Sequence, residues 1–252
     1  MGTTHYATIV ISDIHIGSKW SHTKEAMEFL QDNSCDRLIL NGDIFDGWHL
    51  IRSRKKWRKL YNDFISVIVN MLPTTEVVYI RGNHDDFLEF VAPFKVSNFS
   101  ILNNYIFESH GIKYYVFHGD MFDNVTTNFR WISKFGDKLY SMLLQISRIY
   151  NDLRRHNQEY FSLSKAIKGK VKKWVNSASS FDKNIVKVAN RNKCQGVICG
   201  HIHQAEIKKI EDILYINSGD WIESLTAAVE DASGNWNIIK QHREERRGHR
   251  KL

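Results

Sequence analysis

Five short polar segments of this sequence contain histidine, aspartate or asparagine, in four cases beside a glycine, and each segment follows an apolar run. The candidate side chains are Asp13 and His15; Asp43 and Asp46; Asn83, His84 and Asp85; His118; and His201 and His203. Imidazoles, carboxylates and a carboxamide, without thiolates, suit Mn, Fe or Zn better than a cysteine-based structural zinc site. Two ions about 4 Å apart, sharing one carboxylate, can clamp the oxygens of an in-line displacement and generate hydroxide from water. These residue types therefore predict a two-metal hydrolytic site without a protein nucleophile.

The apolar runs before these segments are rich in β-branched residues, which is typical of strands. The expected strands cover residues 7–12, 37–41, 76–81, 113–118 and 196–199. Helical periodicity at 24–30 and 57–71 separates the first three runs. Alternating strands and helices predict an α/β sheet layered by helices. Because the carboxyl ends of strands in such a sheet meet at one crevice, the five polar segments are expected to converge.

Beyond Asp123 the pattern changes to helical periodicity, with apolar residues three and four positions apart across 132–153. Residues 166–175 and 181–189 continue this pattern. Strands are expected again at 205–210, 213–217, 225–230 and 236–240, and the charged tail 241–252 is expected to be flexible. The prediction is one domain over residues 1–240 that carries a helical insert at about 124–185.

The composition is that of a soluble globular protein, with 42% hydrophobic and 25% charged residues. Three cysteines are too few for a disulfide framework, and neither a signal peptide nor a membrane-spanning run is evident. A cytoplasmic location is therefore expected. The net charge of +7 is concentrated in residues 130–193 and 52–59. Such clusters indicate a phosphate-bearing substrate, a nucleic acid or an anionic membrane surface as partner, or a solvated helical face.

In sequence order, the motifs Asp-x-His, Gly-Asp-x-x-Asp, Gly-Asn-His-Asp, His-Gly-Asp and Gly-His-x-His resemble the signatures of calcineurin-like metallophosphoesterases. The resemblance covers residue 11 to about residue 223 and implies a four-layer α-β-β-α sandwich. It implies one metal ion held by Asp13, His15, Asp43 and His203, and a second held by Asp43, Asn83, His118 and His201. It also implies that His84 is the general acid or a phosphate-binding cation. Asp46 matches the carboxylate that orients His84, and Asp85 is the rival for that role.

Four further features of the sequence look like those of one branch of this family, the UDP-2,3-diacylglucosamine diphosphatases of lipid A synthesis and their relatives. The four features are Gly-Asp-Ile-Phe-Asp-Gly-Trp at 42–48, His-Gly-Asp-x-Phe-Asp at 118–123, Asn-Ser-Gly-Asp-Trp at 217–221 and the helical insert. This resemblance implies two Mn²⁺ ions, release of UMP and an acylated sugar 1-phosphate, and peripheral contact with the cytoplasmic face of the inner membrane. The expected substrate-binding residues are Asp123, Lys165, Lys168 and Lys172. The well-known members of the branch carry arginine where this chain has His84, and histidine is the residue of the wider class.

Two other functions remain open on the sequence alone. A nuclease or cyclic-nucleotide phosphodiesterase would use the same metals, with the basic insert binding a nucleic-acid backbone and aromatic side chains stacking on bases. A binding scaffold would keep the fold without catalysis, although every motif position is filled here. The oligomeric state is not predicted.

Overall fold

The computed structural model describes residues 4–52, 57–122 and 180–241 of the 252-residue chain. The chain divides into two compact units, one formed by residues 1–120 with 188–252 and the other by residues 121–187. The first unit contains both β-sheets and all five polar segments that the sequence singles out. Of the expected helical insert at 124–185, only residues 180–185 are described, and they belong to a helix over residues 180–191.

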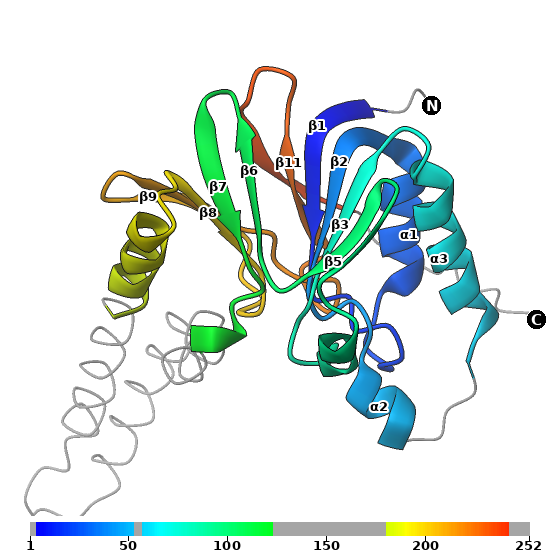
Figure 1. Ribbon diagram of the computed structural model, residues 1–252. Coiled ribbons are helices and arrows are strands. Elements are labelled where there is room, and N and C mark those ends of the chain that lie inside the picture. The colour runs from blue at the N-terminus through cyan, green and yellow to red at the C-terminus, as the bar shows by residue number, and fades with distance from the viewer. Residues whose placement is uncertain (1–3, 53–56, 123–179, 242–252) are drawn as a thin grey trace, which may run out of the picture. The chain divides into compact units, whose positions relative to one another are not determined.

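One sheet has seven strands in the order β12-β11-β1-β2-β3-β5-β4 (Figure 1). Their bounds are β1 (Thr4–Ile11), β2 (Asn33–Asn41), β3 (Glu76–Ile80), β4 (Phe94–Val96), β5 (Phe99–Leu102), β11 (Thr226–Glu230) and β12 (Trp236–Lys240). The neighbours β1, β2, β3 and β5 run parallel, whereas β4, β11 and β12 pair antiparallel with their neighbours. The carboxyl ends of the neighbouring strands β1, β2 and β3 therefore lie along one edge of the sheet.

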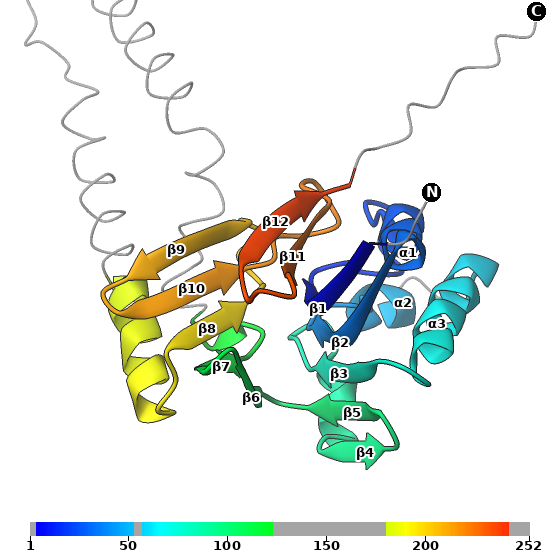
Figure 2. The same ribbon diagram turned by 90° about the horizontal axis from the view of Figure 1, so that it is seen from above.

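The second sheet has five strands in the order β6-β7-β8-β10-β9, and Figure 2 shows it facing the first. Its strands are β6 (Tyr105–Ser109), β7 (Ile112–Val116), β8 (Gly196–Cys199), β9 (Glu206–Ile210) and β10 (Ile213–Asn217). The central strands β7, β8 and β10 are parallel, and the two edge strands are antiparallel. Side chains from both sheets form the core between them, including Val10, Ile39, Val116 and Ile198.

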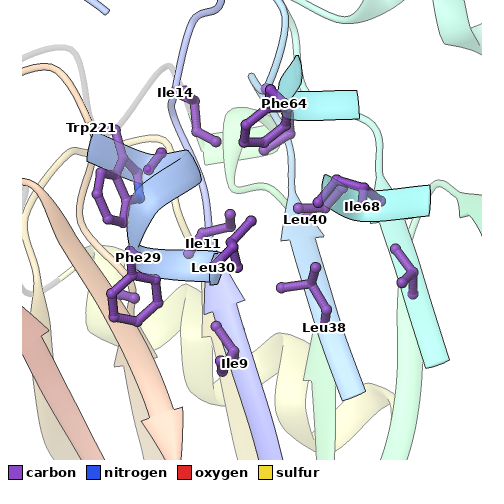
Figure 3. Packing of buried hydrophobic residues seen from close by; sticks show 14 of the residues in the cluster. Ile9, Ile11, Ile14, Phe29, Leu30, Leu38, Leu40, Phe64, Ile68 and Trp221 are labelled. Atoms are coloured by element: carbon purple, nitrogen blue, oxygen red, sulfur yellow. The ribbon is translucent and has the colours of Figure 1, made fainter. Parts of the chain in front are cut away.

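Helices α1 (Thr23–Asp32) and α3 (Lys59–Met71) cover the outer face of the seven-stranded sheet. Phe29 and Leu30 of α1 and Phe64 of α3 pack on Ile9, Ile11 and other strand residues (Figure 3). Ile9 and Ile11 face the helices while Val10 faces the second sheet, because successive side chains of a strand alternate. Burial on both faces explains the continuous apolar runs of β1, β2 and β3, and each such side chain contributes about 1.5–3 kcal/mol.

The expectation of two sheets flanked by helices is confirmed. The sequence reading did not foresee β4, β5 and β6, or the short helix α2 (Gly47–Arg52) and the 3₁₀ turns η1 (Asp86–Phe90) and η2 (Asp120–Phe122). These are short elements of three to six residues, in which periodicity has too little length to show. Across the described ranges, no helix combines the length and apolar character needed to cross a bilayer.

Candidate metal centre

The five polar segments lie at the carboxyl ends of strands from both sheets. Asp13 follows β1, Asp43 follows β2 and Asn83 follows β3 in the seven-stranded sheet, whereas His118 follows β7 and His201 follows β8 in the five-stranded sheet. Hydrogen bonds join neighbouring segments directly: the Asp13 N–H donates to the Gly42 carbonyl at 3.0 Å, and the His15 N–H donates to the Asp43 carbonyl at 2.8 Å. The predicted convergence is therefore observed, and it joins two sheets at one point.

The backbone at these segments is strained in a way that favours a functional role. Five of the ten non-glycine residues with positive φ in the described ranges are Asp13, His15, Asp43, His201 and His203. This left-handed conformation costs free energy for residues with a Cβ, and it concentrates where side chains must be aimed at a common point. Gly82 allows its segment to approach Asp43 closely, because a Cβ at this position would collide with the side chain and backbone of Asp43.

The first cluster of potential ligands contains Asp13, His15 and His203, whose ligand atoms lie within 4.8 Å of one another. The His203 Nε2 atom is 3.1 Å from Asp13 Oδ1, while Asp13 Oδ2 accepts a hydrogen bond of 2.9 Å from the His201 N–H. Atoms bound to one metal at about 2.1 Å and at right angles are separated by about 3 Å. The separation of Asp13 and His203 therefore fits two ligands of one ion.

The second cluster contains Asp43, His118 and His201, also within 4.8 Å of one another. His118 Nδ1 donates to the Asn41 carbonyl at 3.0 Å, which leaves Nε2 as the nitrogen facing Asp43 Oδ2 at 3.4 Å and Asn83 Oδ1 at 3.3 Å. The hydrogen bond to the Asn41 carbonyl fixes the orientation of the His118 imidazole. The clusters adjoin, because His15 Nε2 lies 3.6 Å from the same Asp43 Oδ2.

Burial and charge shift the pKa values of these groups strongly. Burial lowers the pKa of His15 to about 4. Burial also disfavours a charged His118, but the Asp43 carboxylate outweighs this and raises the pKa of His118 to about 10. Burial alone would raise the pKa values of Asp13 and Asp43, yet nearby histidines hold both below their usual range. Two carboxylates that stay ionised in a buried site require positive charge beside them.

The donors in this site fit divalent metal ions. Asp13 is fully buried, and its Oδ1 atom lies 3.1 Å from His203 Nε2 but accepts no hydrogen bond of acceptable geometry in the described part of the chain. A buried, unsatisfied carboxylate oxygen is costly unless a cation or donor occupies its lone pairs. Carboxylates, imidazoles and one carboxamide, with no cysteine among them, match hard-to-borderline ions such as Mn, Fe or Zn.

His84 lies beside the clusters and is oriented by Asp46. His84 Nδ1 is 3.3 Å from Asp46 Oδ1, which also accepts a 2.8 Å hydrogen bond from the His49 N–H. Burial alone would lower the pKa of His84, but its hydrogen bond to Asp46 raises it above the ordinary value. For the Asp46 carboxyl, burial alone would raise the pKa, but the hydrogen bond with His84 holds the pKa of Asp46 below its usual range. The pair therefore favours a protonated imidazole facing a carboxylate.

Asp85 occupies a different position from Asp46. Its two carboxylate oxygens accept hydrogen bonds of 3.1 and 2.9 Å from the Ile44 and Phe45 N–H groups. Asp85 is fully buried, and burial raises its pKa to about 7. The Asp85 side chain thus stabilises the loop that carries Asp43 and Asp46. The carboxylate that contacts the imidazole of His84 is that of Asp46.

Sequence reasoning noted the segment 217–221 as a family feature but did not foresee what it does. Asn217 donates from Nδ2 to the Gly200 carbonyl at 2.8 Å, and the Trp221 N–H donates to the Asp13 carbonyl at 3.1 Å. The Ser218 and Ser12 hydroxyls are 2.7 Å apart. This segment therefore holds the loops of Asp13 and His201 in place from behind. The polar residues of this segment directly follow an apolar strand, and this sequence pattern could have indicated its role.

Four residues expected to bind substrate, Asp123, Lys165, Lys168 and Lys172, lie outside the described residues.

The family model of the calcineurin-like phosphoesterases matches residues 6–205. Comparison with curated proteins gives no match. Among solved structures, the chain is similar to an archaeal phosphodiesterase, with 15% identity, a TM-score of 0.46, and coverage of 92% of this chain and 98% of that one.

Two further structures show the same distant likeness. A predicted phosphoesterase from Streptococcus pneumoniae has 15% identity and a TM-score of 0.38, over 93% of this chain and 97% of that one. Vacuolar protein sorting 29 from Cryptosporidium parvum has 14% identity and a TM-score of 0.41, over 92% and 94%. The family match over residues 6–205 spans most of the sequence, and the chain belongs to the calcineurin-like phosphoesterases, a family of metal-dependent hydrolases.

Proposed function

We propose that the chain hydrolyses a phosphoester or diphosphate at a dinuclear metal centre in which Asp43 is the shared ligand. The observation that carries this proposal is the adjacency of the two clusters at Asp43 Oδ2, 3.6 Å from His15 Nε2 and 3.4 Å from His118 Nε2. One ion would be held by Asp13, His15, Asp43 and His203, and the other by Asp43, Asn83, His118 and His201. A carboxylate between two imidazole groups is suited to bridge two cations.

Two divalent ions supply such a site with charge stabilisation of the phosphoryl oxygens and a lowered pKa of bound water. The chain itself contributes fixed geometry: buried ligands, strained loops and hydrogen bonds to the ligand side chains. Because these groups are oriented before substrate binds, little reorganisation is needed as charge develops in the transition state. No side chain of the site needs to act as a nucleophile.

His84 has the geometry of a general acid in this scheme. Its Nδ1 atom faces Asp46, which leaves Nε2 to donate a proton to the oxygen that departs from phosphorus. Asp46 fixes the orientation of the ring and stabilises its protonated form. The His84 side chain is 26% exposed, whereas those of His118 and Asp43 are 1% and 2% exposed. A partly exposed imidazole at the edge of a buried cluster is accessible to a substrate.

For the substrate we favour UDP-2,3-diacylglucosamine, which would yield UMP and 2,3-diacylglucosamine 1-phosphate. The support is the resemblance of the extended motif at 42–48 and of the segment 217–221 to the diphosphatases of that branch. Under this proposal Mn²⁺ is the metal, and Asp123 with Lys165, Lys168 and Lys172 contacts the substrate. The enzyme would then act at the cytoplasmic face of the inner membrane. Histidine at position 84, in place of arginine, replaces a permanent cation by a group that can give up a proton.

The test is to incubate the purified protein with Mn²⁺ and detergent-dispersed UDP-2,3-diacylglucosamine and to identify products by mass spectrometry. Formation of UMP and the acylated sugar phosphate, absent with Asp43→Ala, is the expected result. Cleavage of a generic aryl phosphodiester or of an oligonucleotide, with no lipid product, would keep the metal mechanism and reject the lipid substrate. Two bound metal ions without hydrolysis of any phosphoester would instead indicate a binding scaffold.

A further inference from the structure

His84 is confined on two further sides besides its contact with Asp46. The indole ring of Trp48 lies with its centroid 4.5 Å from that of the His84 imidazole, and the two planes are tilted by 35°. The His15 ring meets the imidazole edge-on, also at 4.5 Å between centroids. His84 therefore lies between an indole ring and the edge of a candidate ligand, while Asp46 holds its Nδ1 atom.

Trp48 is itself fixed to the segment that carries His84. Its Nε1–H group donates a 3.0 Å hydrogen bond to Asp86 Oδ2, two residues after His84. The preceding residue, Gly47, donates its N–H to the His84 carbonyl at 3.1 Å. A Cβ at Gly47 would lie 2.8 Å from the Phe87 ring and 2.9 Å from that carbonyl, so α2 begins directly against the 84–87 turn.

The exposure of Trp48 argues against a role in the hydrophobic core. The residue is 46% exposed, whereas Trp221 is fully buried within the core. A half-exposed tryptophan contributes little to folding through burial, yet this one makes a ring contact and a hydrogen bond to the same short segment. The ring contact restricts the imidazole of His84, and the hydrogen bond to Asp86 fixes the indole that makes this contact.

We propose that Trp48 is a positioning residue for His84: the indole ring holds the imidazole in the orientation set by Asp46, and Asp86 holds the indole. This inference rests on the proposed function, because it assumes that His84 protonates the leaving oxygen. A proton donor must be aligned with its acceptor to be effective, and a displacement of about 1 Å can cost about a hundredfold in rate. Loss of the indole would therefore act on the step in which the leaving group is protonated.

The experiment uses two phosphodiesters that differ in their need for that proton. With Mn²⁺-loaded protein, kcat and KM are measured for bis(para-nitrophenyl) phosphate, whose leaving group departs readily, and for diphenyl phosphate, whose leaving group is poorer. Trp48→Ala is expected to lower kcat for diphenyl phosphate by about tenfold or more, with less than about a threefold change for the nitrophenyl ester. Trp48→Phe, which keeps an aromatic ring but loses the bond to Asp86, should fall between Trp48→Ala and the wild type.

A double-mutant cycle separates positioning from substrate contact. In a His84→Ala background, Trp48→Ala should cause no further loss, because the group that it positions is gone. Trp236→Phe is the matched control: Trp236 also donates from Nε1, at 3.0 Å to the Tyr114 hydroxyl, but it lies on β12. This control should leave both activities unchanged.

Several outcomes would overturn the inference while leaving the proposed function intact. They are equal losses of kcat on both esters, a raised KM with unchanged kcat, or a further loss in the His84→Ala background. Each would make Trp48 a substrate-contacting or purely structural residue. If wild-type protein with two bound ions hydrolysed neither ester nor any other phosphoester, the proposed function would fail and this inference with it.

Discussion

Asp13 and His203 come from different sheets of the protein and meet at 3.1 Å, between Oδ1 of the carboxylate and Nε2 of the imidazole. Asp13 follows β1 of the seven-stranded sheet, and His203 follows β8 of the five-stranded sheet. They are 190 positions apart in the sequence, as their residue numbers show. The candidate metal centre therefore depends on the packing of one sheet against the other.

Asp43→Ala should remove both metal ions. Asp43 Oδ2 faces both His15 and His118, so its loss takes a ligand from each cluster and leaves imidazoles without the shared anion. Metal content by plasma mass spectrometry should fall from about two ions per chain to near zero. The control is Asp63→Ala, which removes an exposed carboxylate paired with Lys59 on α3 and should not alter metal content. One ion retained at full occupancy would refute the shared-ligand assignment.

His84→Ala should reduce turnover without emptying the metal centre. His84 contacts Asp46 and Trp48 and is not among the proposed ligands, so metal content should stay near that of the wild type. Because general acid catalysis contributes about 10²–10⁴-fold, kcat for an ester with a poor leaving group should drop by a comparable factor. His5→Ala, at an exposed histidine on β1, serves as the control. Loss of both metals in His84→Ala would show that His84 is structural.

Substitution of Asp46 should mainly lower turnover, whereas substitution of Asp85 should mainly lower stability and metal content. Asp46→Asn removes the charge that orients His84 and is expected to lower kcat for poor leaving groups about tenfold, with little effect on folding. Asp85→Ala leaves the Ile44 and Phe45 N–H groups without their acceptor, so stability to urea should fall by about 1–3 kcal/mol for each group. Metal content should fall as well, since the loop bears Asp43. The opposite pattern would make Asp85 the orienting carboxylate.

Stability should decline at alkaline pH because of buried thiol and phenol groups. Burial raises the pKa of Cys35 from 9.0 to about 12, and it also raises the pKa values of Tyr79 and Tyr215. The folded protein retains protons that the unfolded chain releases, so this stability is fully present below pH 9 and is lost as pH rises toward 12. For Cys35 alone the loss is about 1 kcal/mol per pH unit above 9.

Urea unfolding at pH 7, 9.5 and 10.5 measures this effect. Cys35→Ala should show a smaller difference in unfolding free energy between pH 7 and pH 10.5 than the wild type does. The same burial predicts that the three buried thiols of the native protein react slowly with iodoacetamide at pH 8, and that all three react in denaturant. A native thiol that reacts at the rate of a free cysteine would contradict it.

The sequence by itself determined the residue types and their placement after strands. Asp13, Asp43, Asn83, His118 and His201 could be identified because a polar residue closely follows each buried apolar run, in four cases beside a glycine. This local pattern needs no tertiary information. The spacing of apolar residues along the sequence likewise identified the longer strands and helices, such as β2 and α3. Composition and motif order were enough to indicate the chemistry of the site.

The tertiary structure decided which of these residues touch. Sequence left Asp46 and Asp85 as rivals for orienting His84, because both lie near it by motif; the fold turns Asp46 to the imidazole and Asp85 to the backbone of Ile44 and Phe45. It also placed Trp48 against His84 and the 217–221 segment behind Asp13. Contacts of this kind depend on loop conformations with positive φ and on the packing of two sheets, and no local periodicity encodes either.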